Sequence, residues 1–324
     1  MSKSVIIDAV RSPIGVKNGS MIGIRPDDLT AQVVQGLLDR NQEIAFEQIE
    51  DLSLGCAFPE GPQGMLMGRG VVVLAGLPHT TTANTVNRFC GSSMDALHQI
   101  STRIECGDIT VGIAAGVEDM FSIPNGGFAP DLNPLLAEQE YYISMGETAE
   151  NLAKEGNISR EDQEAFTISS HEKALKAATA GKFDNELIPI DFYGELTIEK
   201  DEGPREPDAE KIKSLPPAFI ENGTVTAATS SPFSIGAAAV LLTSEGFAKE
   251  HNLNIRASVV SRAVAGVEWE RMGVGPLPAT EKALAKAVSA GRALCLVHRQ
   301  VAQKMALFAQ VQPFGVLWPF GKQP

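Results

Sequence analysis

The sequence predicts an α/β protein built from βαβ units around a largely buried sheet. Over the first 120 residues, short apolar runs alternate with segments in which apolar residues recur at helical spacing. This alternation of strand and helix is typical of a sheet that helices cover. The 324 residues, of which 44% are hydrophobic, can bury one or two sizeable cores.

The expected elements follow in order along the chain. Strands are expected at residues 5–10, 52–56, 82–86 and 110–117, and helices near 28–39, 68–77 and after Cys90. Asp27 and Asp28 suit the positive end of the first helix dipole, while Gly76 and Pro78 mark the end of the second helix. Segments 234–242 and 256–267 are expected to form a buried strand and helix that complete this core, and residues 272–286 a further helical segment.

From Met120 to about Thr243 the character of the chain changes. This stretch contains many Pro and Gly residues, an amphipathic helical pattern from about 160 to 180, and a charged run around 199–213. It is expected to be an excursion inserted between segments of the core, with a solvated and mobile portion.

Composition and cysteine usage exclude several classes of protein. The formal net charge of −13 argues against a general nucleic-acid surface, and no run approaches the ~18 apolar residues of a membrane span. The four cysteines are irregularly spaced, so they give neither a metal pattern nor a disulfide framework and fit a reducing compartment. The N-terminal MSKSVIIDAV enters a strand without a targeting leader, so a cytoplasmic location is expected.

Cys90 is the strongest candidate for a catalytic residue. It lies in VNRFCGSSMDALHQI, residues 86–100, where an extended run turns into an amphipathic helix. Free amides and the positive dipole end at a helix N-terminus stabilise an anion, so the pKa of this thiol is expected to be lowered and the thiol to act as a nucleophile. Ser92 and Ser93 are expected to cap the helix. The alternative is a buried structural cysteine, the usual fate of a free cysteine.

Several further segments resemble the thiolase family, and within it most of all the degradative 3-ketoacyl-CoA thiolases. Besides VNRFCGSS they are SVIIDAVRSPIG (4–15), RPDDL (25–29), GDITVGIAAGVEDM (107–120), MGETAENLA (145–153), ISREDQEAF (158–166), GTVTAATSSPFSIGAAAVLL (223–242) and MGVGPLPAT (272–280). The resemblance implies that Cys90 accepts the acyl group. A decarboxylating ketoacyl synthase shares the fold and a nucleophilic cysteine but is disfavoured by the RPDDL, VNRFCGSS and GTVTA segments.

The resemblance implies a CoA-dependent acyltransferase. It would cleave 3-ketoacyl-CoA to acetyl-CoA and a shortened acyl-CoA through an acyl-cysteine intermediate, with CoA as co-substrate and no permanently bound cofactor or metal. It also implies a homo-oligomer, either a dimer or a tetramer, that acts in fatty acid beta-oxidation, and it leaves room for a partner in a beta-oxidation complex.

The implied fold is a thiolase-like α/β fold of two βαβαβαββ halves in αβαβα layers, with an inserted loop domain that lies over the catalytic cysteine. On this basis, residues 1–119 and 244–267 form the N-terminal half and residues 120–243 the loop domain. Residues 268–324 form an incomplete, truncated second half with an atypical tail from about residue 288.

Ser231, Met145 and Phe219 match residues that contact CoA along its tunnel in the family. For Ser231, which would lie near the pantetheine, a turn residue before a proline is an equal alternative. The chain departs from the family pattern at Ser144, where short-chain members carry a histidine, at Pro216 for an arginine near the adenine, and at Ile235 for an aspartate. Loss of the arginine would remove a cationic contact with the nucleotide.

The C-terminal stretch departs both from the preceding composition and from the family. After Glu281 the chain has no acidic residue, although about six would be expected from the earlier frequency. The family's Asn-Glu-Ala-Phe and Gly-His-Pro stretches and its glycine-flanked second cysteine are missing or altered. Cys295 and His298 would have to substitute for them, or else they lie on one face of a short helix. The alternative function is a truncated or frame-altered thiolase-like chain with impaired turnover, acting as an acyl-CoA binder or oligomer partner.

Overall fold

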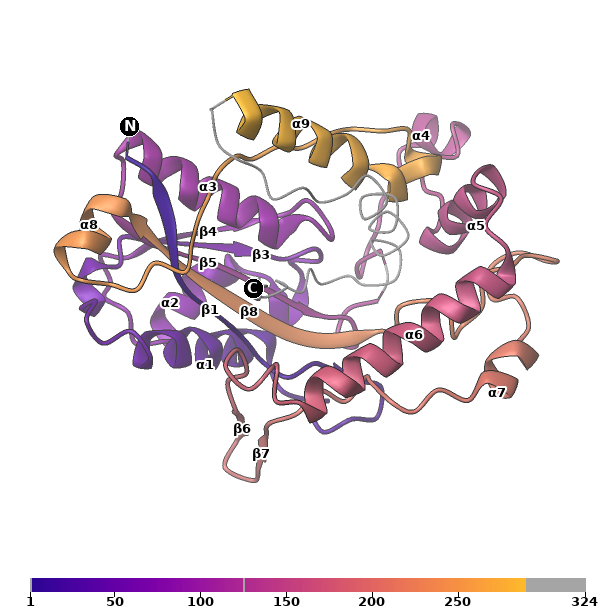
Figure 1. The fold of residues 1–324 in the computed structure, drawn as a ribbon, viewed down its shortest axis with the longest axis horizontal. Coiled ribbons are helices and arrows are strands. Elements are labelled where there is room, and N and C mark those ends of the chain that lie inside the picture. Colours follow the sequence, from indigo (N-terminus) through magenta and orange to yellow (C-terminus); the bar gives the residue numbers. More distant parts are fainter. Residues whose placement is uncertain (1, 125, 290–324) are drawn as a thin grey trace. The chain divides into compact units, whose positions relative to one another are not determined.

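The structure, a computed structural model, describes residues 2–124 and 126–289 (Figure 1). The strands are β1 (Ser4–Arg11), β2 (Gly15–Val16), β3 (Asp51–Gly55), β4 (Thr82–Val86), β5 (Val111–Asp119), β6 (Ile190–Phe192), β7 (Leu196–Ile198), β8 (Ser234–Ser244) and β9 (Ala257–Ser258). The α-helices are α1 (Pro26–Asp39), α2 (Met67–Leu74), α3 (Ser92–Cys106), α4 (Pro134–Glu138), α5 (Met145–Glu155), α6 (Arg160–Thr179), α7 (Ala209–Ser214), α8 (Glu245–Glu250) and α9 (Pro276–Ser289). Short 3₁₀ turns are η1 (Phe46–Gln48), η2 (Gly61–Gln63) and η3 (Trp269–Val274).

The chain forms two compact units, which are described separately. Among the described residues, unit 1 consists of the chain up to Asp131, His171–Glu206 and Pro232–Val260, and unit 2 of Leu132–Ser170, Pro207–Ser231 and residues 261–289. The expected loop domain, 120–243, therefore does not coincide with either unit. Its two ends and a middle part group with the N-terminal sheet.

Unit 1 is organised around one mixed sheet with the strand order β4-β3-β5-β8-β1-β9, in which β2 pairs with β8. Strand β3 is parallel to both β4 and β5, whereas β8 is antiparallel to β5 and β1. Strand β8 lies inside the sheet between β5 and β1, as expected for the buried core segment 234–242. Its small and apolar residues are hydrogen-bonded along both edges of the strand, so residues 234–243 belong to the core of unit 1.

Helices cover both faces of this sheet (Figure 1). Helices α1 and α2 pack on one face, where Leu29 and Val71 join the core cluster that contains Ile113 of β5. Helix α3 packs on the opposite face through Ile100, against Ala114 of β5. Neighbouring residues of β5 thus point to opposite layers, as the two-residue period of a strand requires. The predicted α/β class is confirmed.

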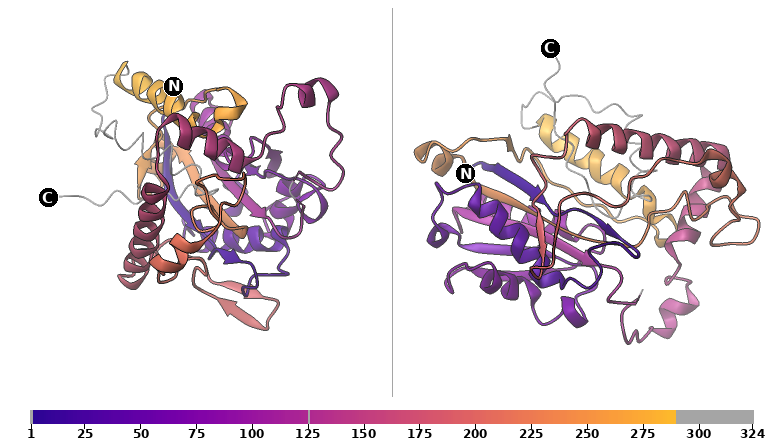
Figure 2. Two further views of the ribbon diagram at one scale, coloured as in Figure 1. Left: turned by 90° about the vertical axis from the view of Figure 1, so that its right-hand side faces the viewer. Right: turned by 90° about the horizontal axis from the view of Figure 1, so that it is seen from below.

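Arg11 explains why residues 171–206 belong to unit 1. Its guanidinium bonds Glu186 and Asp201, each at 2.7 Å, and lies over the ring of Phe183 at 5.3 Å from the ring centroid. The β6–β7 hairpin of the same segment lies beside α1, where Gln32 exchanges two hydrogen bonds with the backbone of Asp191 (Figure 2). These contacts fold the middle of the expected loop domain back onto the first unit.

The expected buried strand at 234–242 is confirmed as β8, whereas the expected buried helix at 256–267 is wrong. Only Ala257 and Ser258 form a strand, β9, which pairs with β1 at the edge of the sheet. Val260 and Val264 are 45% and 49% exposed, and residues 259–267 adopt no helix. An edge strand has one neighbour only, so little of it is buried. The expected helical segment 272–286 appears as η3 followed by α9, which begins at Pro276.

Unit 2 is built from helices and turns joined by side-chain to backbone bonds. Glu150 of α5 accepts hydrogen bonds from the backbone amides of Thr224 and Val225, both at 2.8 Å. Arg271 pairs with Glu155 at the end of the same helix, at 2.6 Å. Residues from 290 onward, which include most of the expected atypical tail, lie outside the described residues.

Candidate active site

Cys90 lies on the turn that joins β4 to α3 in unit 1. Strand β4 pairs in parallel with β3, and the turn spans residues 87–91 before α3 begins at Ser92. Cys90 is an exposed residue, whereas Cys56, which directly follows β3, is buried. The structure thus places Cys90 at the helix start that the sequence predicted, and the alternative of a buried structural cysteine does not fit its exposure.

A pair of glycines lets the start of α3 approach the sheet closely. Gly55 of β3 and Gly116 of β5 are direct partners in the parallel ladder. A Cβ on Gly55 would lie 2.3 Å from the Ser93 amide nitrogen, and a Cβ on Gly116 would lie 1.8 Å from the Ser93 Oγ. A side chain at Gly55 would push the helix away, and one at Gly116 would displace the Ser93 side chain. The two glycines therefore set the height of the Cys90 turn above the sheet.

Local hydrogen bonds hold the turn itself. Asn87 Nδ2 donates to the carbonyl of Ala57 at 2.9 Å, and Asn87 Oδ1 accepts from the Phe89 amide at 2.8 Å. Ser92 Oγ accepts from the Arg88 amide and donates to the Phe89 carbonyl. Phe89 adopts a φ of 44°, a left-handed conformation that is uncommon for a residue with a large side chain. These bonds reverse the chain just before Cys90.

The expected capping role of the two serines is corrected by this geometry. The N-cap of α3 is Gly91, and it makes no side-chain capping bond. Ser92 is already the first helical residue, and its hydroxyl bonds the preceding turn instead of a helix amide. Ser93 contacts Gly116. The serine pair therefore shapes the turn and the sheet contact.

The direction of the Cys90 pKa also differs from the prediction. Desolvation raises the pKa of the Cys90 thiol, its own backbone amide lowers it, and the nearby charge of Glu118 raises it further. Although the residue is exposed, protein atoms around the sulfur exclude part of the water that would solvate a thiolate. In unit 1 the amide at the helix start does not outweigh this loss of water.

Sequence reasoning did not single out Glu118, which lies buried beneath the turn. Its carboxylate accepts from the Ala57 amide at 2.6 Å, from Gln63 Nε2 at 2.8 Å and from the Phe58 amide at 3.3 Å. Desolvation raises its pKa, and these three donors lower it. The available signal was an acidic residue near the carboxyl end of an otherwise apolar strand, in GVEDM.

The residues expected to contact CoA lie in unit 2. Met145 is the first residue of α5 and is 55% exposed, and Phe219 is 44% exposed. The Phe219 ring packs directly on the backbone of Gly146, since a Cβ there would lie 2.0 Å from the ring. The structure thus brings Met145 and Phe219 to one place in unit 2.

Ser231 and Ser144 have identifiable local surroundings. Ser231 follows a turn that is held by bonds between Thr226 and Thr229, and it is half-buried. Ser144 is the N-cap of α5, where it forms a reciprocal capping box with Glu147. This structural role accounts for a serine at that position.

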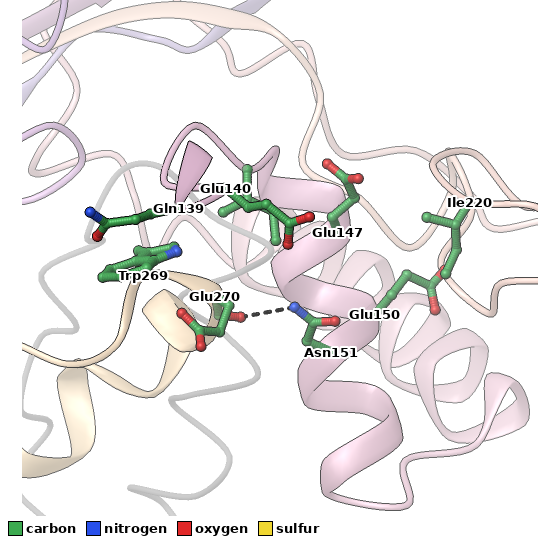
Figure 3. Close-up of a pocket in the computed structure, with 9 residues that line it drawn as sticks. Gln139, Glu140, Glu147, Glu150, Asn151, Ile220, Trp269 and Glu270 are labelled. Carbon is green, nitrogen blue, oxygen red and sulfur yellow. Dashed lines mark hydrogen bonds between the residues drawn. The ribbon is translucent and has the colours of Figure 1, made fainter. Parts of the chain in front are cut away.

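Unit 2 contains a cavity of about 400 Å³, and several of the residues that line it are neighbours in sequence of Ser144, Met145 and Phe219 (Figure 3). Its lining is Gln139, Glu140, Ile143, Glu147, Glu150, Asn151, Ile220, Trp269 and Glu270. Asn151 Nδ2 donates to the Glu270 carbonyl across it, at 3.2 Å. The four glutamates would repel the phosphates of CoA, so this cavity is a poor site for the nucleotide.

Cys295 and His298, which would have to replace the missing catalytic groups, lie outside the described residues. Within residues 2–124 and 126–289, no cluster of three His, Cys, Asp or Glu side chains could hold a metal ion. None of the helices in those ranges is long and apolar enough to span a bilayer.

Comparisons with known proteins agree with this geometry. Residues 4–246 match the model of the thiolase N-terminal domain family. A 3-ketoacyl-CoA thiolase of Photobacterium profundum is 44% identical over 297 residues, which cover 89% of this chain and 76% of that protein. A 3-ketoacyl-CoA thiolase of Bacillus subtilis is 42% identical over 301 residues, which cover 88% and 76%.

A solved structure supports the same assignment. The crystal structure of the Bacillus anthracis acetyl-CoA acetyltransferase superposes with a TM-score of 0.82 at 33% sequence identity. The superposition covers 96% of this chain and 84% of that one. With its family match, its relatives and its fold in agreement, the chain belongs to the thiolase family.

Proposed function

We propose that this thiolase-family acyltransferase cleaves 3-ketoacyl-CoA with CoA, to give acetyl-CoA and an acyl-CoA shortened by two carbons. The observation that carries the proposal is an exposed cysteine, Cys90, on a tightly bonded turn at the N-terminus of α3. Relatives over most of the chain are named 3-ketoacyl-CoA thiolase, which supports the choice of substrate class.

The proposed reaction has two half-reactions. After losing its proton, the Cys90 sulfur attacks the 3-keto carbon, the bond between the second and third carbons breaks, and the departing carbanion takes up a proton to leave as acetyl-CoA. The sulfur of a second CoA then attacks the acyl carbon of the acyl-cysteine. The shortened acyl-CoA leaves, and the thiol of Cys90 is restored.

The described residues supply positioning and charge stabilisation for these steps. The first amides of α3 lie beside Cys90, and they would stabilise negative charge on sulfur and on the developing oxyanion. Gly55 and Gly116 keep those amides close to the sheet. We assign CoA contacts to Met145, Phe219 and Ser231. For Met145 and Phe219 the assignment is supported by their exposure and by the packing of the Phe219 ring beside Met145, on Gly146.

The finer assignments are part of the same proposal. Thiolysis balances with CoA alone as the second substrate, so the proposal includes no permanently bound cofactor and no metal. We further propose a homo-oligomer that acts in fatty acid beta-oxidation in the cytoplasm. The names of the relatives support the substrate class of this proposal alone.

The direct test is to trap the acyl-enzyme. The full chain is incubated with acetoacetyl-CoA or acetyl-CoA in the absence of free CoA, digested with a protease and mapped by mass spectrometry. We expect one acetyl group on the peptide that carries Cys90, and its removal when CoA is added. Cys90→Ala should remain unlabelled, while Cys106→Ala, at the far end of α3, should label normally. Acetyl groups on Cys106 instead, or on no cysteine, would contradict the proposal.

A further inference from the structure

Glu118 is a buried carboxylate that the proposed reaction does not use directly. It is 8% exposed and sits on β5, two residues beyond Gly116. Its oxygens face the Ala57 and Phe58 amides and the side-chain amide of Gln63. The Cys56 Sγ lies 3.9 Å from the same carboxylate. A buried charge is costly unless its surroundings satisfy it, so this arrangement calls for an explanation.

The partners of Glu118 favour its ionised form. Every group that faces it is a hydrogen-bond donor, and a carboxylate is an acceptor only. Gln63 cannot be turned around, because its Nε2 also donates to the Phe58 carbonyl at 2.9 Å and its Oε1 accepts from the Asp119 amide at 2.6 Å. The donors around Glu118 therefore favour its charged form, and the bonds of Gln63 fix one orientation of its amide.

This network continues to the nucleophile through the segment after β3. Glu118 holds the amide side of Ala57, and the carbonyl side of Ala57 accepts from Asn87. Asn87 in turn accepts from the amide of Phe89, the residue before Cys90. A second link is the packing of Phe58 on Phe89, whose ring centroids are 5.9 Å apart.

We propose that Glu118 is a positioning residue for Cys90, which acts through the 56–58 segment and Asn87 to hold the Cys90 turn in its reactive geometry. The inference rests on the proposed function, because it assumes that Cys90 is the nucleophile. Two independent links, one of hydrogen bonds and one of ring packing, lead from the same carboxylate to the same turn.

The charge of Glu118 acts against the nucleophile, which allows its two effects to be separated. Its negative charge raises the pKa of the Cys90 thiol and also that of Cys56. Asp119 is the further titratable group that acts on Glu118, while Arg88 beside the turn pairs with Asp95 at 3.2 Å. Because the charge of Glu118 opposes formation of the Cys90 thiolate, its presence here is better explained by the hydrogen bonds through which it positions the turn.

Two substitutions separate position from charge. Glu118→Gln removes the charge and places an NH₂ group against at least one N–H donor, so it changes both. Glu118→Asp keeps the charge but is shorter by one methylene, so it cannot reach the same amides. Asp51→Asn is the matched control, because Asp51 is another buried carboxylate of unit 1, bonded to Arg103 and Thr82 at the start of β3.

Three measurements on the full chain test the proposal. The pH midpoint of iodoacetamide alkylation of Cys90, followed peptide by peptide, should move to lower pH in Glu118→Gln only, with a rate at neutral pH raised by about twofold or more. Hydrogen exchange in peptides covering residues 56–60 and 86–92 should be faster in both Glu118 variants. The kcat of thiolysis should fall at least about tenfold in both, with a smaller change in KM. Asp51→Asn should lower the melting temperature without any of these changes.

The possible outcomes are distinct. If Glu118→Gln folds and exchange in residues 86–92 stays at the native rate, the positioning role is wrong, whatever happens to the alkylation midpoint. The same holds if Asp51→Asn gives equal changes, since the effect would then be general destabilisation. If alkylation and exchange change as expected but the native chain performs no thiolysis, the proposed function fails while the structural link from Glu118 to Cys90 stands.

Discussion

The ends of two neighbouring parallel strands, β3 and β4, carry cysteines with opposite properties. Cys56 follows β3 directly, is 1% exposed and lies against Glu118, and burial raises its pKa to about 12. Cys90 comes four residues after the end of β4, on a turn that is reversed at Phe89, and it is an exposed residue. The two strands are parallel, but β3 lies inside the sheet and β4 at its edge. The difference between the two cysteines therefore reflects the place of each strand as well as the chain that follows it.

This comparison shows what makes a cysteine available for chemistry in this fold. The segment after β3 turns inward and its amides bind Glu118, which closes Cys56 off from water. The segment after β4 is bonded to that inward segment, because Asn87 donates to the Ala57 carbonyl. This bond helps to hold Cys90 in its exposed position. The segment that buries Cys56 thus supports the turn that exposes Cys90.

The largest expected effect comes from exchanging sulfur for oxygen at each strand end. Cys90→Ser should lower the rate of acetoacetyl-CoA thiolysis by at least about a thousandfold, because a hydroxyl at this place is a far weaker nucleophile. Cys56→Ser should lower it by less than about tenfold, since only the support of the turn is altered. Cys106→Ser, an exposed cysteine on the last turn of α3, should keep the native rate. Equal losses at positions 56 and 90 would contradict the distinction between the two ends.

A second, smaller effect is expected at the glycine pair beneath α3. Gly55→Ala places a Cβ against the backbone of Ser93, which cannot rotate away, whereas Gly116→Ala meets a serine side chain that can. We expect losses in free energy of unfolding of about 1–3 kcal/mol, larger for Gly55→Ala. Thiolysis should fall by up to about a hundredfold, since displacing the helix start moves Cys90. Both are measured by urea unfolding and by steady-state rates.

Gly70→Ala is the matched control for the glycine pair. Gly70 lies within α2, and a Cβ built there meets no atom within 4 Å. This substitution should leave thiolysis unchanged and stabilise the protein by about 0.5–1 kcal/mol, because alanine loses less backbone entropy in a helix. If Gly55→Ala behaved like Gly70→Ala, the close approach of α3 to the sheet would not matter for activity.

Much of this region could be predicted from the sequence because its signals are local. The β4–turn–α3 unit follows from an extended run, a glycine and a helical period, and it places Cys90 at the helix start. The class of the fold follows from the alternation of strands and helices in the same way. The family resemblance on those segments is confirmed by the match over residues 4–246.

What the sequence did not predict depends on contacts between distant segments. The raised pKa of Cys90 requires knowledge that Glu118 and desolvating atoms lie near it, 28 residues further along the chain in the case of Glu118. The sequence predicts that residues 234–242 form a buried core strand, but not that this strand, β8, pairs with both β5 and β1. Helical and strand periods report neighbours along the chain, and they carry no information on such partners.

The smallest expected effect sharpens the comparison through pH. The Cys56 thiol, with a pKa raised to about 12 in the folded protein, keeps its proton above pH 9, where the unfolded thiol has lost its own. The unfolded chain therefore binds fewer protons than the folded one in this window, and the stability contributed by Cys56 is lost as pH rises from 9 toward 12. Between pH 9 and 10 the loss should be about 1 kcal/mol, measured as the change in free energy of urea unfolding. Cys56→Ser has no such proton to lose, so its stability should fall less over the same interval, by that difference. Equal pH slopes for the native chain and Cys56→Ser would show that the buried thiol titrates like an exposed one, and the contrast between the two strand ends would then have to be explained without burial.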